Sequence, residues 1–525
     1  MALTRLNASG ATSTKNRTDS ICLFSGMCTT CVDGCLGTCE IGRSAIRGAE
    51  VIYPQPFGSV TAASEKDYPI DLSHFNIMGT AVGAYGVEPS SDAAIFPAVN
   101  LETAVGRDGS LKCKLPFIIP GLGSTDVAKN NWEGLAIGAA LSGVPLTIGE
   151  NVCGMDDSAV IENGRVVSSP DLERRVKLYK EWQLDGYGEI IVQSNVEDTN
   201  LGVLEYAIEK LGVKAVELKW GQGAKDIGGE VKISSLEKAQ RLYDRGYIVL
   251  PNPRDPAVIE AFNAGVFREF ERHSRLGMVS EDAFASRVQE LRDMGAKYVF
   301  LKTGAYRPAD LARAVKWSSK YQIDLLTIDG AGGGTGMSPW RMMNEWGIPT
   351  VEIWSLAYNY LDTLAMRGEY VPPTAFAGGI TMEDQIFKVL ALGAPYVKLV
   401  GMARGPLAAA MVGKNVGSLI AAGNIPGIYK RYGSTIEEVF VGTIELRRLL
   451  DGKYKDVPPG AIGLFTYYQR LAQGLRQLMA GARKFALQYI SRDDIAAITR
   501  EAAEVSGIAY ITELDADEVE SILNS

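Results

Sequence analysis

The chain has 525 residues, 46% of them hydrophobic, and its formal net charge at pH 7 is −9. This acidic balance offers no basic footprint for nucleic acid, and no apolar stretch is long enough to span a membrane. The first twenty residues lack an apolar signal region, so we expect a cytoplasmic protein of two or three domains, or of one elaborated barrel.

Five of the seven cysteines lie between residues 22 and 39, and the last four are spaced C-x2-C-x3-C-x3-C. Reduced thiols clustered in this way favour metal or redox chemistry over disulfides, so we expect an iron–sulfur cluster, of the 4Fe–4S type. Structural zinc is the alternative, because C-x2-C also suits tetrahedral zinc, and the absence of any metal is the third. The candidate ligands are Cys22, Cys28, Cys31, Cys35 and Cys39. Because a cluster needs four ligands, one candidate is surplus, and we take it to be Cys22.

From about residue 115 onward, short apolar runs that end in glycine or polar residues alternate with stretches of helical periodicity. This alternation predicts βαβ units and a parallel sheet, and eight strands favour a (β/α)8 barrel over an open, doubly wound sheet. Two further runs, 247–251 and 350–354, are interpreted as strands of inserted or flanking structure. The eight predicted barrel strands are Phe117–Pro120, Val144–Gly149, Glu189–Gln193, Lys214–Trp220, Tyr298–Thr303, Asp324–Asp329, Thr374–Ala377 and Tyr396–Val400.

Helices are predicted where apolar residues recur at helical spacing, in NNWEGLAIGAALSG, NLGVLEYAIEKLG, PADLARAVKWSSKY and TMEDQIFKVLALG. The chain beyond about residue 430 is also expected to be helical, and its clearest amphipathic stretch is expected to pack on the barrel or on a second subunit. The expected organisation is a flexible N-terminus, a Cys-rich and barrel-flanking segment, the barrel, and a helical C-terminal region, over residues 1–20, 21–115, 116–425 and 426–525.

Glycine-rich and polar loops follow the predicted strands, and these loops would line one mouth of the barrel. The loops after strands seven and eight, 378–381 and 401–405, carry glycines whose backbone N–H groups can reach a phosphate. The helix that starts at TMEDQ would present its N-terminus to the same anion, and Arg404 would add a charged contact. We therefore predict a phosphorylated ligand at this mouth.

Charged residues end several predicted strands. Lys302 ends strand five and Lys219 ends strand four, where a lysine can stabilise negative charge on a flavin or hold a substrate carboxylate. Asp329 and Glu150 also end strands and are candidates for positioning or protonating a substrate. The alternatives are solvated surface lysines and acids that only cap the next helix. No P-loop and no G-x-G-x-x-G motif occurs, so pyridine nucleotides would be oxidised by another polypeptide.

Several of these loops resemble the FMN-binding domain of the glutamate synthase family. KWGQGAKDIGGE (219–230) resembles its K-x-G-Q-G-A-K-x-x-x-G-G segment, and DGAGGGTGMSP (329–339) resembles its G-x-x-G-G-T-G-x-S-P loop. LKTGAYRPADLA matches the place of its strand-five lysine, and GENVCG (149–154) is similar to its T-G-E-G-G loop. The resemblance runs from about residue 116 to residue 405, and more loosely into ISRDDIAAITREAAEVSGI.

The resemblance implies a barrel with FMN at its mouth, in which reduced FMN delivers hydride to 2-iminoglutarate, formed from 2-oxoglutarate and ammonia, to give glutamate. The candidate catalytic residues are Lys302, which the resemblance places beside flavin and substrate, and Glu150 and Asp329, which are candidates from their places at strand ends. The implied cofactor contacts are Pro120, Gly121, Gly123, Ser124, Gln193, Lys219, Lys302, Gly378, Gly379, Gly401 and Arg404. The implied substrate contacts are Gln222, Lys225, Gly333 and Gly334.

Three departures from the family bear on partners and substrate. The family's amidotransferase domain has no counterpart, so ammonia would come from a glutaminase subunit or from solution. In the family the cluster cysteines follow the last barrel strand, whereas no cysteine here follows Cys153, so the N-terminal run would have to supply a different cluster. That cluster would take electrons from a ferredoxin or an NAD(P)H-oxidising subunit, in a homo- or hetero-oligomer. The loop GENVCG changes the substrate wall, which leaves open an N-methylglutamate-synthase-like enzyme or another FMN and iron–sulfur reductase. A non-catalytic electron-transfer scaffold is the third reading.

Overall fold

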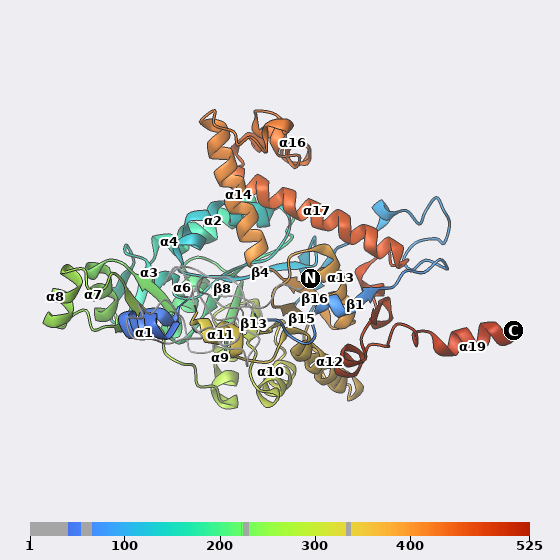
Figure 1. The fold of residues 1–525 in the computed structure, drawn as a ribbon, viewed down its shortest axis with the longest axis horizontal. Helices are drawn as coiled ribbons and strands as arrows, with labels where there is room; N and C mark the ends of the chain where they lie inside the picture. The colour runs from blue at the N-terminus through green and yellow to red at the C-terminus, as the bar shows by residue number, and fades with distance from the viewer. Residues whose placement is uncertain (1–39, 54–65, 222, 224–229, 332–337) are drawn as a thin grey trace, which may run out of the picture.

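A computed structural model of the chain describes residues 40–53, 66–221, 223, 230–331 and 338–525 (Figure 1). Eight parallel strands close a barrel in the order β13-β14-β15-β16-β4-β5-β8-β9. Each strand falls within or overlaps one of the eight predicted runs, so the closed barrel is confirmed and the open sheet is wrong. The barrel strands are β4 (Phe117–Leu122), β5 (Leu146–Ile148), β8 (Ile190–Ser194), β9 (Ala215–Lys219), β13 (Tyr298–Thr303), β14 (Leu325–Asp329), β15 (Thr374–Ala377) and β16 (Val397–Gly401).

Helices cover the outside of the barrel, and three of the four predicted stretches form single helices. The fourth, 200–212, is divided between α5 and α6 at Gly202, whose φ of 69° ends one helix and starts the next. The helices between or after the strands are α2 (Asp126–Leu141), α4 (Pro170–Trp182), α5 (Val196–Leu201), α6 (Val203–Glu209), α9 (Glu281–Asp293), α10 (Pro308–Lys320), α12 (Thr350–Met366), α13 (Glu383–Leu392) and α14 (Arg404–Ala421).

The predicted strand at 350–354 is wrong, because these residues form the first turns of α12. The buried residues Val351, Trp354, Leu361 and Leu364 recur at helical spacing, and Pro349 stands at the N-cap. The apolar run that suggested a strand is the start of a longer amphipathic helix. The other extra run, 247–251, contains β11 (Ile248–Leu250) and does belong to an insertion.

That insertion lies between β9 and β13. An antiparallel sheet of β10 (Glu230–Ile233), β12 (Phe270–His273) and β11 packs there with α7 (Leu236–Asp244) and α8 (Pro256–Asn263). Segment α1 (Glu40–Arg47) lies beside it in Figure 1, and the Arg47 guanidinium donates to the Val266 carbonyl at 3.2 Å. The first described helix, α1, therefore contacts the insertion.

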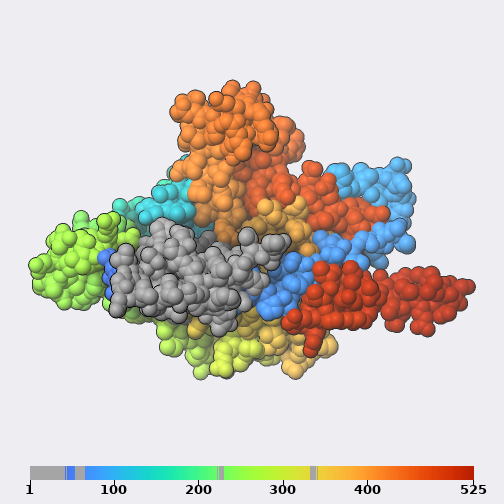
Figure 2. Space-filling model, viewed as in Figure 1, coloured from blue at the N-terminus to red at the C-terminus, as the bar shows by residue number. Residues whose placement is uncertain are grey.

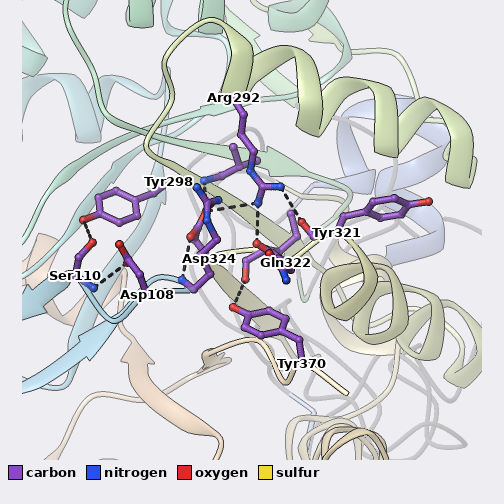
Figure 3. Close-up of polar contacts among 11 residues, drawn as sticks. Asp108, Ser110, Arg292, Tyr298, Tyr321, Gln322, Asp324 and Tyr370 are labelled. Atoms are coloured by element: carbon purple, nitrogen blue, oxygen red, sulfur yellow. Dashed lines mark hydrogen bonds and ion pairs between the residues drawn. The ribbon is translucent and has the colours of Figure 1, made fainter. Parts of the chain in front are cut away.

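A hairpin of β2 (Thr103–Val105) and β3 (Leu111–Cys113) closes the N-terminal end of the barrel. Val105, Leu111 and Cys113 pack on the inward-facing residues of the barrel strands. Asp324, just before β14, accepts from the Arg107 backbone N–H at 2.9 Å and from its guanidinium at 3.2 Å (Figure 3). This end is a packed structural base, so a ligand site has to lie at the other end.

The C-terminal region is helical, as predicted, and its long helix α17 (Pro459–Gly481) packs on α2 and α14. Glycines allow the close approach: a Cβ atom on Gly413 would lie 2.4 Å from the Pro459 carbonyl oxygen, and one on Gly134 would lie 2.9 Å from the Gly460 carbonyl carbon. The far half of α14 and α16 (Thr443–Leu450) project from the body, as does α19 (Ala516–Asn524) (Figures 1 and 2). None of the described helices is both long and apolar enough to cross a membrane.

Shorter elements complete the description. They are β1 (Phe75–Ile77), β6 (Val160–Glu162), β7 (Arg165–Ser168), β17 (Ile495–Ala497), α3 (Val152–Met155), α11 (Trp340–Glu345), α15 (Ile436–Val439), α18 (Arg500–Ser506), and 3-10 turns at Gly48–Ile52, Leu72–His74, Phe96–Ala98, Lys430–Tyr432, Asp451–Asp456, Leu487–Tyr489 and Arg492–Asp494.

Candidate active site at the barrel mouth

Two lysines and two carboxylates meet at the C-terminal ends of the strands. Lys302 on β13 stands in register with Lys219 on β9, so both side chains face the inside of the barrel. The Lys219 ammonium lies 2.6 Å from a Glu150 carboxylate oxygen, and the Lys302 ammonium lies 3.2 Å from an Asp329 carboxylate oxygen. All four side chains are at most 15% exposed. The structure thus assembles the three predicted catalytic residues around Lys219.

The lysines and acids of this group fix each other's charge. Burial would raise the pKa of Glu150, but Lys219 and Lys302 outweigh it and lower that pKa to about 2. Burial would lower the pKa of Lys302, but the neighbouring Asp329 and Glu217 raise it above its ordinary value. At neutral pH the mouth therefore holds an ammonium group at Lys302 and a carboxylate at Glu150.

Glu217 is a buried carboxyl that the sequence reasoning missed. It lies two residues before Lys219 on β9, and the Gln193 amide donates to it at 2.5 Å. Burial raises the pKa of Glu217, although Lys302 acts in the opposite direction. Its signal in the sequence is a single acid inside an otherwise apolar strand, at the spacing that puts it on the same face as Lys219.

Gln193 and the loop after β4 form one wall of the mouth. The side-chain oxygen of Gln193 is buried, and none of the residues that the structure describes donates a hydrogen bond to it. A Cβ atom on Gly121 would lie 2.7 Å from that oxygen, and one on Gly123 would lie 2.5 Å from the Glu150 carbonyl oxygen. Glycine is thus required where the predicted cofactor loop Pro120–Ser124 passes Gln193 and Glu150. A buried acceptor without a donor is suited to a ligand N–H group.

The loops that follow β15 and β16 are neighbours, because Ala377 pairs with Gly401 at the ends of these strands. Gly378 and Gly379 have φ of 140° and 94°, and α14 begins at Arg404 without a side-chain cap. Among the described residues, no acceptor pairs with the N–H groups of Gly379, Ile380, Ala403, Arg404 and Gly405. Such a set is a ready anion site, and the Arg404 side chain is exposed beside it. We call this group of five N–H donors the anion cradle.

Before the first turn of α13, Gln385 accepts from the Thr381 N–H at 2.8 Å and from the Met382 N–H at 3.1 Å. These two N–H groups are therefore occupied, and the expected contribution of the α13 N-terminus to anion binding stays a prediction. Gly401, the last residue of β16, leads into the first turn of α14.

The insertion reaches the mouth through Asn151, the residue after Glu150. Asn151 has a left-handed φ of 66°, and its N–H donates to Asp198 at 2.8 Å. Its side-chain oxygen accepts from Ser274 at 3.3 Å and from Tyr247 at 3.4 Å, both in the insertion. These contacts hold the backbone at Glu150, and burial raises the pKa of Asp198 to about 7.

The remaining predicted site residues lie outside the described part of the chain. In residues 40–53, 66–221, 223, 230–331 and 338–525, no group of three or more His, Cys, Asp or Glu side chains is placed to hold a metal ion. The predicted cluster and substrate residues outside those ranges are Cys22, Cys28, Cys31, Cys35, Cys39, Gln222, Lys225, Gly333 and Gly334.

Comparison with known proteins finds sequence similarity to glutamate synthases. A family model described as "Conserved region in glutamate synthase" matches residues 273–412, which include β13 to β16 and all five residues of the anion cradle. The glutamate synthase large subunit-like protein YerD of Bacillus subtilis (strain 168) is 30% identical over 190 residues, 36% of this chain. The match spans 32% of YerD, about a third of its length.

Solved structures with a similar arrangement include two oxidoreductases of known name. A mutant flavocytochrome b2 with pyruvate bound shares 13% identity at a TM-score of 0.45, covering 81% of this chain and 76% of that one. A mutant (S)-mandelate dehydrogenase shares 14% identity at a TM-score of 0.42, covering 81% and 88%. The likeness to the glutamate synthase family rests on the two sequence matches, to residues 273–412 and over 190 residues of this chain.

Proposed function

We propose that the chain is an FMN-dependent oxidoreductase that reduces 2-iminoglutarate, formed from 2-oxoglutarate and ammonia, to glutamate. The observation that carries the proposal is the pairing of Lys219 and Lys302, in register at the mouth of a glutamate-synthase-family barrel. Two buried ammonium groups side by side suit anionic partners, and both a flavin nucleotide and a dicarboxylate are anionic.

The residues present fit a flavin nucleotide in two places. The anion cradle offers N–H groups that no described residue accepts from, and these suit a phosphate. The buried side-chain oxygen of Gln193, which likewise has no described donor, suits an N–H group of a flat ring. When bound, reduced FMN would supply hydride to an electrophilic carbon. We assign the phosphate to Gly379, Ala403 and Arg404, and the ring edge to Gln193 and Lys302.

The lysines and acids would have different roles toward the substrate. The Lys302 ammonium, held charged by Asp329, would neutralise negative charge that develops beside it. Glu150 stays ionised at neutral pH, so it would attract the cationic iminium group while Lys219 attracts a carboxylate. The lysine-to-acid spacing at the mouth thus matches a substrate that carries both signs of charge.

The cysteine run is proposed as the electron entry site, as a 4Fe–4S cluster, with zinc as the alternative content. Helix α1 begins at Glu40, directly after Cys39, and is held against the insertion by the Arg47 contact to Val266. The insertion in turn contacts Asn151 beside Glu150. A ferredoxin or an NAD(P)H-oxidising subunit would deliver the electrons, a glutaminase subunit or solution would provide ammonia, and we place the enzyme in the cytoplasm.

A second candidate differs only in the amine. The residues after Glu150 are Asn151, Val152 and Cys153, where the family motif has two glycines, and the Asn151 side chain ties this backbone to the insertion through Ser274 and Tyr247. Such a change in pocket shape alters discrimination between amines, which favours testing an N-methylglutamate-synthase-like reaction.

The experiment that tests the proposal begins with anaerobic purification and measurement of FMN and iron per chain. Reduced dye, 2-oxoglutarate and either ammonia or methylamine are then added, and amino acid products are identified. Glutamate from ammonia supports the first candidate, and N-methylglutamate from methylamine supports the second. A reducible flavin that turns over with neither amine would reject both, and a protein without flavin affinity would reject the FMN assignment.

A further inference from the structure

The C-terminal helix α17 reaches the anion cradle through Tyr467. The Tyr467 hydroxyl donates to the Thr381 carbonyl, in the loop after β15. A Cβ atom placed on Gly405, in the first turn of α14, would lie 2.7 Å from the same hydroxyl oxygen. Tyr467 therefore stands between the two loops that supply the cradle's N–H groups.

The peptide group that joins Thr381 to Met382 is held from both of its sides. Its carbonyl oxygen accepts from Tyr467, and its N–H donates to the Gln385 side chain at 3.1 Å. Because a peptide group is planar, these two bonds fix the orientation of the whole unit. The glycine turn that precedes it, where backbone freedom is greatest, is thereby anchored at its far end.

One turn further along α17, Arg470 forms an ion pair with Glu383, the first residue of α13. On the other side of Tyr467, the neighbouring Tyr468 ring packs on Phe117 of β4, with ring centroids 5.4 Å apart. These contacts set the position of α17 along the barrel, so the Tyr467 hydroxyl has a defined place.

We propose that Tyr467 is a positioning residue for the phosphate group of the flavin nucleotide, acting through the Thr381–Met382 peptide. The inference rests on the proposed function. It also assigns a cofactor role to a helix outside the family-matched residues 273–412. Without the hydroxyl, the Thr381 carbonyl can turn toward the bound anion, where its negative end repels phosphate, and the cradle loses its preorganisation.

The test uses Tyr467→Phe with Tyr468→Phe as the matched control. Both changes remove one phenolic oxygen from the same helix, but the Tyr468 hydroxyl is buried without a hydrogen-bond partner in the described structure. Each purified full-length apoprotein is titrated with FMN and with riboflavin, which lacks the phosphate, and its melting temperature is recorded.

Tyr467→Phe is expected to weaken FMN binding about 5- to 10-fold, the effect of losing one hydrogen bond of typical strength. Riboflavin binding should stay at the wild-type value, the melting temperature of the apoprotein should fall by only a few degrees, the cost of one hydrogen bond, and Tyr468→Phe should leave FMN binding unchanged. Gln385→Ala, which releases the other side of the same peptide, should repeat the FMN-specific loss and serves if Tyr467→Phe does not fold.

Two results would overturn the inference alone: FMN affinity that is unchanged in both variants, or an equal loss for FMN and riboflavin. A wild-type protein that does not bind FMN would instead overturn the proposed function, and the inference with it. The riboflavin arm separates an effect on the phosphate from a general loosening of the mouth.

Discussion

Lys219 and Lys302 stand side by side on neighbouring strands, in register across the β9–β13 pair. Each is balanced by a carboxylate, Glu150 from the loop after β5 for the first and Asp329 from the end of β14 for the second. Two like charges on adjacent inward positions of a barrel are costly unless paired, so the two carboxylates are needed to keep both lysines at the mouth.

The first prediction concerns Lys302. Lys302→Ala should leave the protein folded and lower turnover of 2-oxoglutarate with ammonia by about 100-fold or more, because it removes the charge that offsets developing negative charge at the mouth. Turnover is followed with reduced dye and product analysis. Lys320→Ala is the control, since Lys320 is exposed and pairs with Glu281 on the outside of the barrel. Wild-type rates in Lys302→Ala would refute the assigned role.

The second prediction concerns the contact between the insertion and the mouth. A Cβ atom on Gly154 would lie 1.7 Å from the Tyr247 hydroxyl oxygen, which also contacts Asn151. Gly154→Ala should therefore displace Tyr247 and lower the free energy of unfolding by about 2 kcal/mol, as overpacking typically does. Gly427→Ala, where a Cβ atom would meet no atom within 4 Å, should change it little. Denaturant unfolding measures both, and equal effects would contradict the contact.

The third prediction concerns the closed end of the barrel. Asp324→Asn weakens the bonds to Arg107 while leaving the mouth untouched, so stability should fall by about 2–4 kcal/mol with FMN affinity unchanged. Asp310→Asn, which breaks an exposed pair with Arg313, should cost less than about 1 kcal/mol. Loss of FMN affinity in Asp324→Asn would show that the two ends are coupled.

The fourth prediction is a pH dependence at His273. Burial would lower its pKa, but hydrogen bonds and charges from Glu230 and Glu271 outweigh burial and raise the pKa to about 9. A raised pKa means that the stabilisation is complete below about pH 6.5 and disappears as pH rises through 9. The stability difference between wild type and His273→Gln should shrink over that range. NMR titration of the ring, one of two in the chain, gives the pKa directly, and a value near 6.5 would disprove the pairing.

The fifth prediction tests the cysteine run. Anaerobically purified protein should contain about four iron atoms per chain, the content of one 4Fe–4S cluster. Cys31→Ser and Cys35→Ser should lose them, whereas Cys113→Ala, at a buried cysteine of β3, should keep them. Zinc in place of iron would make the run structural, and electrons would need another route to the flavin.

The barrel was predictable because its strands are mostly apolar runs, each followed by a glycine-rich or polar loop at the same end. The strand expected at 350–354 failed because a short apolar run also begins an amphipathic helix, and only the later buried positions such as Leu361 separate the two. Lys219, Lys302, Glu150 and Asp329 were each located by their place at a strand end.

The sequence did not reveal how those residues are placed relative to one another. The register that pairs Lys219 with Lys302 depends on how neighbouring strands align, which no single strand encodes. Tyr467 lies in the C-terminal amphipathic stretch, which the sequence predicts only to pack on the barrel or on a second subunit, and its contact to Thr381 arises from packing between distant segments. Gln385 looks like any polar helix residue until its cap contacts are seen.

The most direct test of the account mixes anaerobically reduced, FMN-loaded protein with 2-oxoglutarate and ammonia and follows the flavin absorbance in a single turnover. The account predicts that the flavin is reoxidised only when both compounds are present, with one glutamate formed for each flavin. A flavin that stays reduced in their presence, and equally with methylamine in place of ammonia, would contradict it.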